Sequence, residues 1–465
     1  MKIRFRLLIA AICLFNALHA QETAKRLELA MNQLLKDAAF EHAIFGIYVA
    51  DASTGKTVFE MNSNDGLAPA SCQKIITSVA ALELLCKEFR YSTNFYLNRK
   101  GNSNFLGIDA SGDPSFGSNR WNYTSVSNIY KKLLNALREK QVQQLSPEIT
   151  INTGSFSYQP VPDGWVWQDI GNYYGAGAYA FNWNENKFDW ILESDKKLGD
   201  SVIIKGFDPD NSHINTRCLI RTGEKGSGDN AYIYSSPYNS NYFATGTIPA
   251  GQTKFVVKAS MHDPADFFSR ELLLRLEANG LMSESSQLTG SPVRYTTDKD
   301  NGELIATFQS PSLDSINYWF LKKSINLYGE ALVKTMGDKV KNTASTDSGV
   351  DVIRTFWAGK GIEKSSLKII DGSGLSPANR VTAKALVQVL QYAKKQSWFP
   401  FFYNALPEMN GMKMKDGYIG GVRSYAGYSK SSSGKEYIFC FIVNNFDGEP
   451  AAAREKIWAL LDLLK

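Results

Sequence analysis

The sequence predicts an α/β protein, in which one sheet covered by helices is assembled from both ends of the chain and interrupted by a large insertion. An amphipathic segment at 23–36 precedes two strand-like runs near the N-terminus, and two further runs precede a last helix near the C-terminus. The runs are Phe45–Ala50, Thr57–Met61, Ser424–Ser429 and Tyr437–Val443, and the last helix is Ala451–Leu464. Apolar runs of this length indicate strands, and helices at both ends favour an α/β domain.

The middle of the chain, from about Phe95 to Thr289, has a different pattern. Strand-like runs alternate there with aromatic loops such as Trp165–Tyr179 and with a polar tract, Arg221–Asn230. The expected strands are Glu148–Asn152, Ser201–Ile204 and Phe255–Ala259, and the expected helices are Val126–Lys140 and Ala265–Asn279. We expect this stretch to be an insertion of two nested modules within the α/β domain.

Length and composition are those of a multidomain globular protein. A chain of 465 residues is long enough for two or three domains, each with its own core. The hydrophobic fraction of 43% and the charged fraction of 21% are typical of globular proteins. Because the net charge is only +5, nucleic acid is not expected as a partner.

The first twenty residues have the order of a secretory signal. Lys2, Arg4 and Arg6 precede the apolar run Leu7–Phe15, and small residues lead to a cleavage site near Ala20. The apolar run is too short to span a membrane. Cleavage would remove three positive charges and leave a net charge of +2. We therefore expect an exported protein, located in the periplasm or otherwise outside the cytoplasm.

The last helix has one apolar side, formed by Ile457, Trp458, Leu460, Leu461 and Leu464. Packing on the sheet is the favoured explanation, and contact with a membrane surface is the alternative. Peripheral contact is therefore the most membrane association that the sequence predicts. No internal repeat is present, and the sequence does not define an oligomeric state.

Cysteine and histidine spacing gives no sign of a metal or cofactor site. The cysteines beyond the leader are Cys72, Cys86, Cys218 and Cys440. None belongs to a C-x-x-C pair, no H-E-x-x-H occurs, and the pairing of the cysteines stays open. Only His42, His213 and His262 lie beyond the leader, and none has the context of a Ser-His-Asp triad. In a hydrolase with this sequence, lysine is the better candidate for the base.

The tetrapeptide S-x-x-K occurs five times, at Ser53/Lys56, Ser71/Lys74, Ser194/Lys197, Ser365/Lys368 and Ser432/Lys435. Only Ser71 follows a proline-containing loop, Leu67–Ala70, and opens a long apolar helix, Ile75–Leu85. One helical turn then separates Ser71 from Lys74 on the same face. A serine needs a base to attack a carbonyl, and lysine serves when its pKa falls from about 10.4 toward neutrality. The pattern therefore favours Ser71 as nucleophile and Lys74 as base.

Two further short motifs follow downstream. Ser324-Ile325-Asn326 places a hydroxyl and an amide together at a turn or helix start, and a similar S-x-N lies nearby at 315–317. Lys415-Asp416-Gly417 precedes a strand-like segment, Tyr418–Tyr428. There a lysine can hold a carboxylate, and backbone N–H groups can line an oxyanion hole.

S-x-x-K, S-x-N and K-x-G, in this order, resemble the motifs of penicillin-binding proteins and serine β-lactamases. About 250 residues separate the first two motifs. This long gap resembles the class C low-molecular-mass penicillin-binding proteins, the D-Ala-D-Ala carboxypeptidase/endopeptidase family S13. Four further segments are similar to that family: Ser111–Phe116, Gly164–Asp169, Tyr174–Ala176 and Asp371–Ser376.

The resemblance implies a role for each motif residue. Ser71 would be acylated, with Lys74 as its base, and Ser324 would relay a proton to the leaving amine. Asn326 would position the substrate backbone. Lys415 would hold the terminal carboxylate and lower the pKa of Lys74.

The remaining substrate contacts are implied in the same way. Backbone N–H groups of Ser71 and Tyr418 would form the oxyanion hole, and Asp416 and Gly417 would complete the substrate-binding strand. Asp169 would contact the side chain of the diamino acid in the stem peptide. The implied partners are peptidoglycan stem peptides as substrates and β-lactams as inhibitors, with no cofactor.

The resemblance also implies the fold, a penicillin-binding-protein/β-lactamase-like serine transpeptidase fold with nested inserted domains. After a signal peptide at 1–20, the expected peptidase domain covers 21–93 and 292–465. One inserted domain covers 94–155 and 245–291, and a second, nested in the first, covers 156–244.

Asp416 departs from the family pattern, which has Thr or Ser at the middle of the third motif. Its carboxylate lacks the hydroxyl and carries a charge that repels the carboxylate of a substrate. A catalytically weakened peptidoglycan-binding protein on the same scaffold is therefore one alternative. A β-lactamase is another, disfavoured by the long insertion.

Overall fold

The computed structural model describes residues 22–101, 103–211, 213–282 and 290–465. The expected leader and its cleavage site near Ala20 lie outside the described residues. The chain forms two compact units. Unit 1 contains the residues up to Leu82, Asn317–Ser324 and Ile353–Lys465, and unit 2 contains Glu83–Ile316 and Ile325–Val352.

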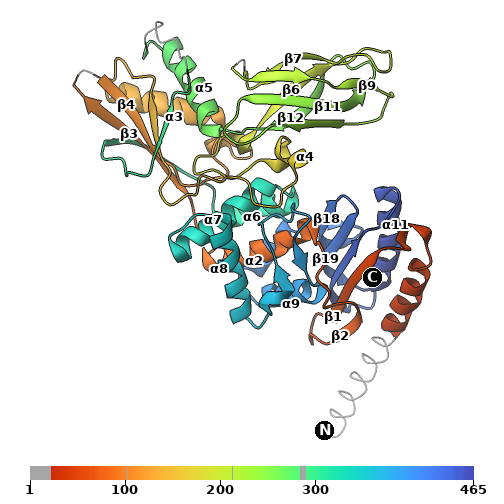
Figure 1. Cartoon of the computed structure of the whole chain (residues 1–465). Helices are drawn as coiled ribbons and strands as arrows, with labels where there is room; N and C mark the ends of the chain where they lie inside the picture. The colour runs from red at the N-terminus through yellow and green to blue at the C-terminus, as the bar shows by residue number, and fades with distance from the viewer. Residues whose placement is uncertain (1–21, 102, 212, 283–289) are drawn as a thin grey trace. The chain divides into compact units, whose positions relative to one another are not determined.

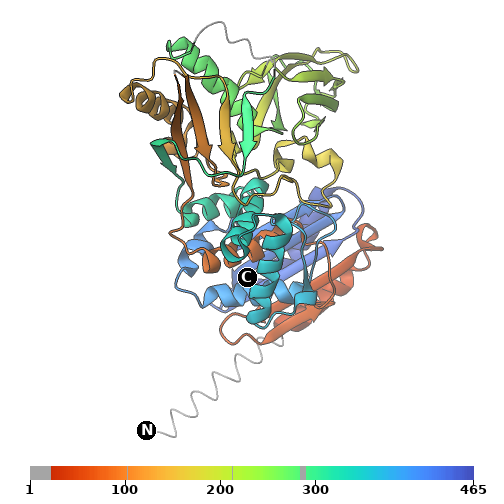
Figure 2. The same cartoon turned by 60° about the vertical axis from the view of Figure 1, so that its left-hand side comes forward.

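Unit 1 is built on a six-stranded antiparallel sheet of order β17-β18-β19-β20-β1-β2. Its strands are β1 (Ile44–Asp51), β2 (Thr57–Met61), β17 (Glu408–Met409), β18 (Met412–Ile419), β19 (Val422–Lys430) and β20 (Glu436–Asn444). In Figures 1 and 2 the red N-terminal strands lie beside the blue C-terminal strands. The predicted assembly of one sheet from both ends of the chain is confirmed by the pairing of β1 with β20.

Successive side chains of each strand point to opposite faces of this sheet, and helices cover both faces. On one face, an N-terminal helix at 22–34 and helix α11 (Pro450–Leu461) pack on the odd-numbered positions of β20, Phe439, Phe441 and Val443. Ile457, Leu460, Leu461 and Leu464 are buried in this core, so the apolar side of the last helix packs on the sheet. On the other face, α9 (Ala383–Lys394) contacts β1, β19 and β20.

Further helices carry the predicted motifs or lie near them in the sequence. They are the 3₁₀ helix η2 (Ala70–Gln73), α2 (Lys74–Leu84), α6 (Leu313–Lys322), α7 (Asn326–Lys341), α8 (Thr346–Gly359) and α10 (Phe399–Ala405). A two-stranded sheet pairs β15 (Leu367–Lys368) with β16 (Arg380–Val381). Helix α2 is buried from Lys74 to Leu82, including its polar residues Lys74, Thr77 and Ser78.

Unit 2 contains a five-stranded sheet of order β13-β5-β4-β3-β14. Its strands are β3 (Ser92–Lys100), β4 (Ser103–Asp109), β5 (Ile149–Asn152), β13 (Val293–Thr296) and β14 (Glu303–Gln309). Helix α3 (Val126–Glu139) contacts β14, and α5 (Pro264–Ala278) contacts β13. Both helices present apolar side chains to the core of unit 2. Figure 2 shows strands from the two ends of the insertion side by side in this sheet.

Two smaller sheets complete unit 2. One has the order β12-β6-β7, with β6 (Lys187–Glu193), β7 (Ile203–Asp208) and β12 (Phe255–Ser260). The other joins β10 (Asn230–Tyr234), β11 (Asn241–Pro249) and β8 (Asn215–Cys218), and β9 (Arg221–Gly223) also pairs with β11. The loop at 165–179 forms the short helices α4 (Trp167–Ile170) and η4 (Tyr173–Gly175).

Most predicted strands and helices are confirmed to within a few residues, but one segment differs. The third motif lies inside β18, and the expected single strand Tyr418–Tyr428 is two strands joined at Gly420-Gly421. Positive φ at Gly421 allows this tight turn. The predicted division into three domains stays a prediction. All four cysteines beyond the leader are free thiols. Within the described ranges, no helix has the length and hydropathy that crossing a bilayer requires.

Candidate active site

Ser71 and Lys74 are brought together at the start of α2. Ser71 lies in η2, which begins at Ala70 with a left-handed φ of 43°, and Lys74 is the first residue of α2. The Lys74 Nζ donates a hydrogen bond to Ser71 Oγ at 2.8 Å. A non-glycine residue in the left-handed region is strained, and such strain is concentrated at functional sites. The nucleophile and base predicted from the sequence are therefore within proton-transfer distance.

The side chain of Lys74 is fully buried, with 0% of its surface exposed. Its Nζ also donates to the backbone carbonyl of Ser373 at 2.7 Å. This carbonyl fixes the amine in the direction of the serine hydroxyl, because a buried donor is held by its acceptors. Ser71 itself is only partly buried, so its oxygen is reachable from solvent.

The loop that carries Ser71 is fastened to three strands of unit 1. Cys72 Sγ donates to the carbonyl of Lys415 in β18 at 3.1 Å, and Ser424 Oγ in β19 donates to the carbonyl of Pro69 at 2.5 Å. The Asn444 side chain in β20 exchanges two hydrogen bonds with the backbone of Ala68. Burial raises the pKa of the Cys72 thiol to about 12, so this thiol stays protonated and acts as a donor. These contacts hold Ser71 against the strand that carries the third motif.

Gly417 shows how closely β18 approaches the nucleophile. A Cβ atom added at Gly417 would lie 2.8 Å from the backbone nitrogen of Ser71 and 2.7 Å from the carbonyl oxygen of Pro69. Any larger residue would push β18 away from η2, which explains the glycine of K-x-G. Tyr418 is the next residue of β18. An oxyanion hole formed by its N–H and that of Ser71 stays a prediction.

Lys415 is paired with the residue that departs from the family pattern. Its Nζ, on a side chain 1% exposed, donates to both the carbonyl and Oδ1 of Asp416 at 2.7 Å. Although burial opposes ionisation, the Lys415 charge and hydrogen bond, helped by Arg423, lower the pKa of the Asp416 carboxyl. Asp416 is therefore ionised at neutral pH and occupies the ammonium that was expected to hold a substrate carboxylate.

The segment Asp371–Ser376, for which we predicted no role, forms a buried turn. The Asp371 carboxylate accepts from the backbone N–H groups of Gly374 and Ser376 and from the side chains of Gln73 and Asn379, at 2.7–2.9 Å. Gly374, with φ of 81°, packs so closely that an added Cβ would lie 1.9 Å from the carbonyl oxygen of Ala70. The turn thereby aims the Ser373 carbonyl at Lys74. The small and polar residues of this segment were the feature of the sequence that could have indicated the turn.

The second motif lies at the junction of α6 and α7. Ser324 follows α6 with a left-handed φ of 55°, and Asn326 is the first residue of α7. Ser324 belongs to unit 1 with Ser71, Lys74 and Lys415, whereas Asn326 belongs to unit 2. The similar sequence at 315–317 lies inside α6, where Ser315 accepts a hydrogen bond from the Trp121 indole. The strained backbone distinguishes Ser324 from this second candidate.

Within unit 2, the structure connects Asn326 to Asp169. Asn326 Nδ2 donates to the carbonyl of Tyr174 at 2.8 Å, and the Tyr174 hydroxyl is hydrogen-bonded to the Asp169 carboxylate. Burial raises the pKa of Asp169 to about 6, although the bond from Tyr174 opposes this shift. Both residues predicted to contact the peptide therefore converge on one loop of unit 2.

Histidine does not supply an alternative base in the described chain. His262 Nε2 lies 3.0 Å from Ser260 Oγ, but the ring is fully buried and Ser260 donates to the carbonyl of Ile170. Burial lowers the pKa of His262 to about 3, so the ring is neutral. This pair is closed to substrate and belongs to the packing of unit 2.

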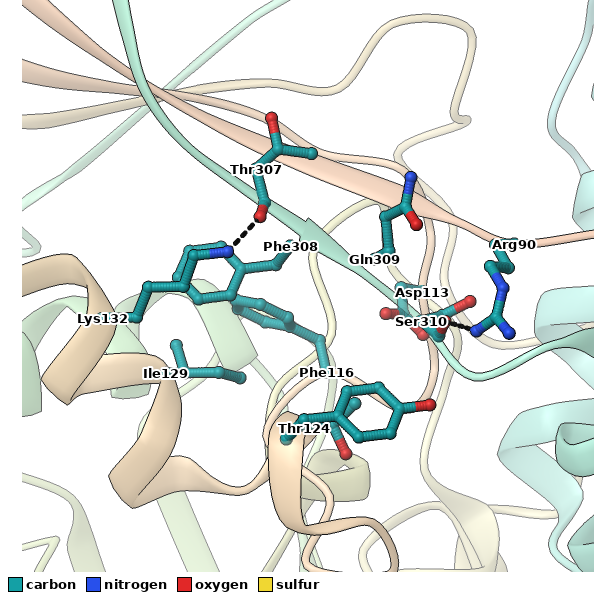
Figure 3. Close-up of a pocket in the computed structure, with 11 residues that line it drawn as sticks. Arg90, Asp113, Phe116, Thr124, Ile129, Lys132, Thr307, Phe308, Gln309 and Ser310 are labelled. Atoms are coloured by element: carbon teal, nitrogen blue, oxygen red, sulfur yellow. Dashed lines mark hydrogen bonds between the residues drawn. The ribbon is translucent and has the colours of Figure 1, made fainter. Parts of the chain in front are cut away.

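A cavity of about 470 Å³ in unit 2 contains none of the predicted site residues (Figure 3). Its two cationic side chains are bound by backbone carbonyls, Lys132 by Thr307 at 2.6 Å and Arg90 by Ser310 at 2.7 Å. Asp113 in its wall accepts from Ser115, and burial raises the pKa of this carboxyl to about 6. Asp113 lies in the family-like segment Ser111–Phe116, which therefore contributes to the interior of unit 2.

Comparison with known proteins supports the resemblance to the D-Ala-D-Ala carboxypeptidases. A model of the D-Ala-D-Ala carboxypeptidase 3 (S13) family matches residues 27–464. The D-alanyl-D-alanine carboxypeptidase of Actinomadura sp. (strain R39) is 25% identical, over 97% of this chain and 87% of that protein. The D-alanyl-D-alanine carboxypeptidase DacB of Haemophilus influenzae is 23% identical, over 86% of this chain and 85% of that protein.

The fold is similar to that of penicillin binding protein 4 from Haemophilus influenzae, known from its crystal structure. The two share a TM-score of 0.75 at 20% identity, over 91% of this chain and 95% of that chain. This likeness confirms the predicted fold class. The family match over nearly the whole chain confirms the resemblance carried by the three motifs. The chain therefore belongs to the D-Ala-D-Ala carboxypeptidase 3 (S13) family of serine peptidases, the class C penicillin-binding proteins.

Proposed function

We propose that this serine-type D-Ala-D-Ala carboxypeptidase acts on peptidoglycan stem peptides through an acyl-enzyme at Ser71 and is inhibited by β-lactams. The observation that carries the proposal is the 2.8 Å contact between Lys74 Nζ and Ser71 Oγ. The close approach of Gly417 to the nitrogen of Ser71 supports it, because an acyl carbonyl needs donors beside the nucleophile.

In the proposed acylation step, Lys74 accepts the hydroxyl proton of Ser71 while Oγ attacks the carbonyl carbon of the D-alanyl residue. The N–H groups of Ser71 and Tyr418 stabilise the oxyanion of the tetrahedral intermediate. The intermediate then collapses: the C–N bond breaks, and the proton that Lys74 took from Ser71 passes through Ser324 to the departing amine, which leaves Lys74 neutral again. In hydrolysis, Lys74 takes a proton from the attacking water and returns it to Ser71 Oγ as the C–Oγ bond of the ester breaks.

The substrate contacts are assigned residue by residue. We assign the terminal carboxylate of the peptide to Lys415, which must then exchange its bond to Asp416 for one to the substrate. Asn326 and Asp169, joined through Tyr174, are assigned to the peptide backbone and to the diamino acid, respectively. A carboxylate suits the ammonium of a diamino acid because opposite charges within about 4–6 Å favour each other.

We further propose that the protein is exported and acts in the periplasm. The support is the order of charged, apolar and small residues in the first twenty positions. Peptidoglycan lies outside the cytoplasmic membrane, so the proposed substrate requires export. N-terminal sequencing of the protein recovered from the periplasm tests this proposal, and an intact N-terminus on a cytoplasmic protein would contradict it.

The central test is the intact mass of the purified protein after incubation with benzylpenicillin. We expect one covalent adduct, which is absent in Ser71→Ala and present in Ser78→Ala. Ser78 is a matched control, because it is a serine of α2 whose buried hydroxyl has no partner among the described residues. Folded protein that neither forms an adduct nor consumes the drug would overturn the assignment of Ser71.

The ion pair between Lys415 and Asp416 favours one second candidate, a catalytically weakened peptidoglycan-binding protein. Sacculus binding that is unaffected by Ser71→Ala, together with no release of D-alanine from a D-Ala-D-Ala peptide, would support this candidate. Rapid release of hydrolysed drug from the adduct would instead indicate a β-lactamase. Cleavage of a crosslinked peptide, compared with release of terminal D-alanine, separates endopeptidase from carboxypeptidase activity.

A further inference from the structure

The outer face of the β10-β11-β8 sheet in unit 2 carries a row of aromatic side chains. Tyr232 is paired with Thr245, and Tyr234 with Phe243, so these side chains share one face. Arg217 in β8 is paired with Phe243 and extends the row. The residues between them, Ala231, Ile233, Tyr242 and Ala244, point to the other face and are buried in the core of unit 2. Tyr232, Tyr234 and Phe243 are therefore not needed for that core.

Trp167 of α4 joins this row from the side. Its ring meets Tyr234 and Phe243 edge-on at centroid distances of 5.3 and 5.9 Å, and the latter two rings are stacked at 4.8 Å. We call Trp167, Tyr232, Tyr234, Phe243 and Arg217 the aromatic platform. Trp167 is 59% exposed and Tyr232 38% exposed. A continuous exposed apolar surface with a polar rim indicates a binding surface.

The aromatic platform is preformed, because α4 is fixed to the sheet by its backbone. Asn172 Oδ1 accepts from the N–H of Ile233 in β10 at 3.1 Å. Gly171 packs so closely that an added Cβ would lie 2.0 Å from the carbonyl oxygen of Ile233. A surface that is held in place before binding loses little conformational entropy when a ligand arrives.

We propose that the aromatic platform binds the glycan strand of peptidoglycan, a chain of N-acetylated sugars. Flat aromatic faces match the apolar faces of pyranose rings, and hydroxyl and guanidinium groups match sugar hydroxyl and acetamido groups. Tyr232, Thr245 and Arg217 supply such polar groups on the same face.

The position of the aromatic platform in the chain determines which ligand is expected. Trp167 and Asp169 belong to the same four-residue helix, α4. In the proposed function, Asp169 contacts the diamino acid of a stem peptide, and two residues separate that amino acid from the sugar. Two extended residues span about 7 Å, so a peptide bound at Asp169 carries its sugar to the neighbourhood of α4. The inference rests on the proposed function in this respect, and it names the second part of the substrate.

Direct binding tests the inference without any catalysis. We would measure binding of purified glycan strands, stripped of their stem peptides, to the full chain in a Ser71→Ala background. We expect Trp167→Ala to weaken binding at least about tenfold, which corresponds to about 1.4 kcal/mol, and Arg217→Ala by about threefold to tenfold. Tyr123→Ala is the matched control, because Tyr123 is a 54% exposed aromatic residue of unit 2 outside the aromatic platform. Both platform residues are exposed, and a thermal melt of each variant verifies its fold.

The outcomes separate this inference from the proposed function. Failure of the Ser71→Ala protein to bind glycan, or equal binding by the platform variants, overturns the inference and leaves penicillin acylation of the parent unaffected. A dimer that Trp167→Ala disperses in sedimentation would show that the platform is a self-interface, which also overturns the inference. Conversely, a parent protein that penicillin does not acylate would contradict the proposed function. Glycan binding does not require acylation and is measured independently of it.

Discussion

The side chains assigned to function in the two units differ in burial. In unit 1, Lys74, Asp371 and Lys415 are at most 1% exposed, and each is held by hydrogen bonds. Unit 2 instead exposes large aromatic side chains, among them Trp167 at 59% and Tyr173 at 51%. Burial and hydrogen bonds hold a polar group in one orientation, and the breaking of a bond requires groups that are oriented in this way. Exposed rigid rings offer area, which binding of a large substrate requires.

The comparison predicts that the largest single effect comes from the buried base of unit 1. Lys74→Met keeps the volume of the side chain and removes the donor to Ser71 and Ser373. We expect the rate of acylation by benzylpenicillin to fall by about 10³–10⁴, the usual loss for a general base. Stopped-flow or mass kinetics measures this rate.

Lys56→Met is the control, because Lys56 ends another S-x-x-K tetrapeptide but lies exposed on a turn. Acylation at the parental rate in Lys74→Met would show that burial of this amine serves packing only. A slow rate in both variants would show that the substitution acts through the fold.

Buried polar groups of unit 1 are also expected to determine its stability. Asp371→Ala leaves the donors of Gly374, Ser376 and Asn379 without this acceptor. Each buried donor without a partner costs about 1–3 kcal/mol, so we expect the free energy of unfolding to fall by at least about 3 kcal/mol. Urea unfolding measures the change, and exposed Asp65→Ala is the control. Equal stability of the two variants would contradict the assigned role of the Asp371 turn.

Unit 2 has an exception to the comparison, the buried carboxyl of Asp113. Burial raises the pKa of this carboxyl from its ordinary value of 3.8 to about 6, so the folded protein binds a proton more tightly than the unfolded chain. Stability from this group is therefore present below about pH 4 and is lost as the pH rises through about 6. The loss amounts to about 2–3 kcal/mol at about 1.4 kcal/mol per pKa unit.

Asp113→Asn keeps an oxygen for Ser115 and removes the titration. We expect the variant to be less sensitive to pH than the parent between pH 4.5 and 7.5, with its gain in stability at the higher pH. Urea unfolding at both pH values measures this difference. The other carboxyl groups with raised pKa values, such as Asp169, are common to both proteins and cancel in the comparison. Parallel pH profiles would contradict the prediction.

The smallest effect is expected at Asp416, at the partly exposed edge of the unit 1 site. Its side chain is 40% exposed, so its ion pair with Lys415 is screened and contributes at most about 1 kcal/mol. Asp416→Thr frees the Lys415 ammonium and should raise the acylation rate by about threefold to fivefold. Asp416→Asn separates the two causes: a gain in both variants identifies the charge, and a gain in threonine alone identifies the hydroxyl. Unchanged acylation rates in both variants would show that Asp416 does not limit acylation.

The sequence alone predicted those features that depend on residues close together in the chain. The strands Phe45–Ala50 and Thr57–Met61 were predicted because two-residue alternation is a local property. Ser71 was chosen among five S-x-x-K matches because only its neighbours combine a proline loop with an apolar helix. Each of these signals lies within about ten residues of the feature that it predicts.

The tertiary structure decided what depends on contacts between distant segments. The carbonyl of Ser373 reaches Lys74 across about 300 positions of the chain, and Gly417 meets Ser71 across a still longer separation. Tyr234 and Phe243 were visible in the sequence, but their pairing on an outer face follows only from the register of β10 and β11. The sequence by itself determined which residues are candidates for the chemistry, because side-chain type and local propensity can be read from it directly. Which groups face them was decided by packing, since a shift of one residue in a strand turns every side chain to the other face.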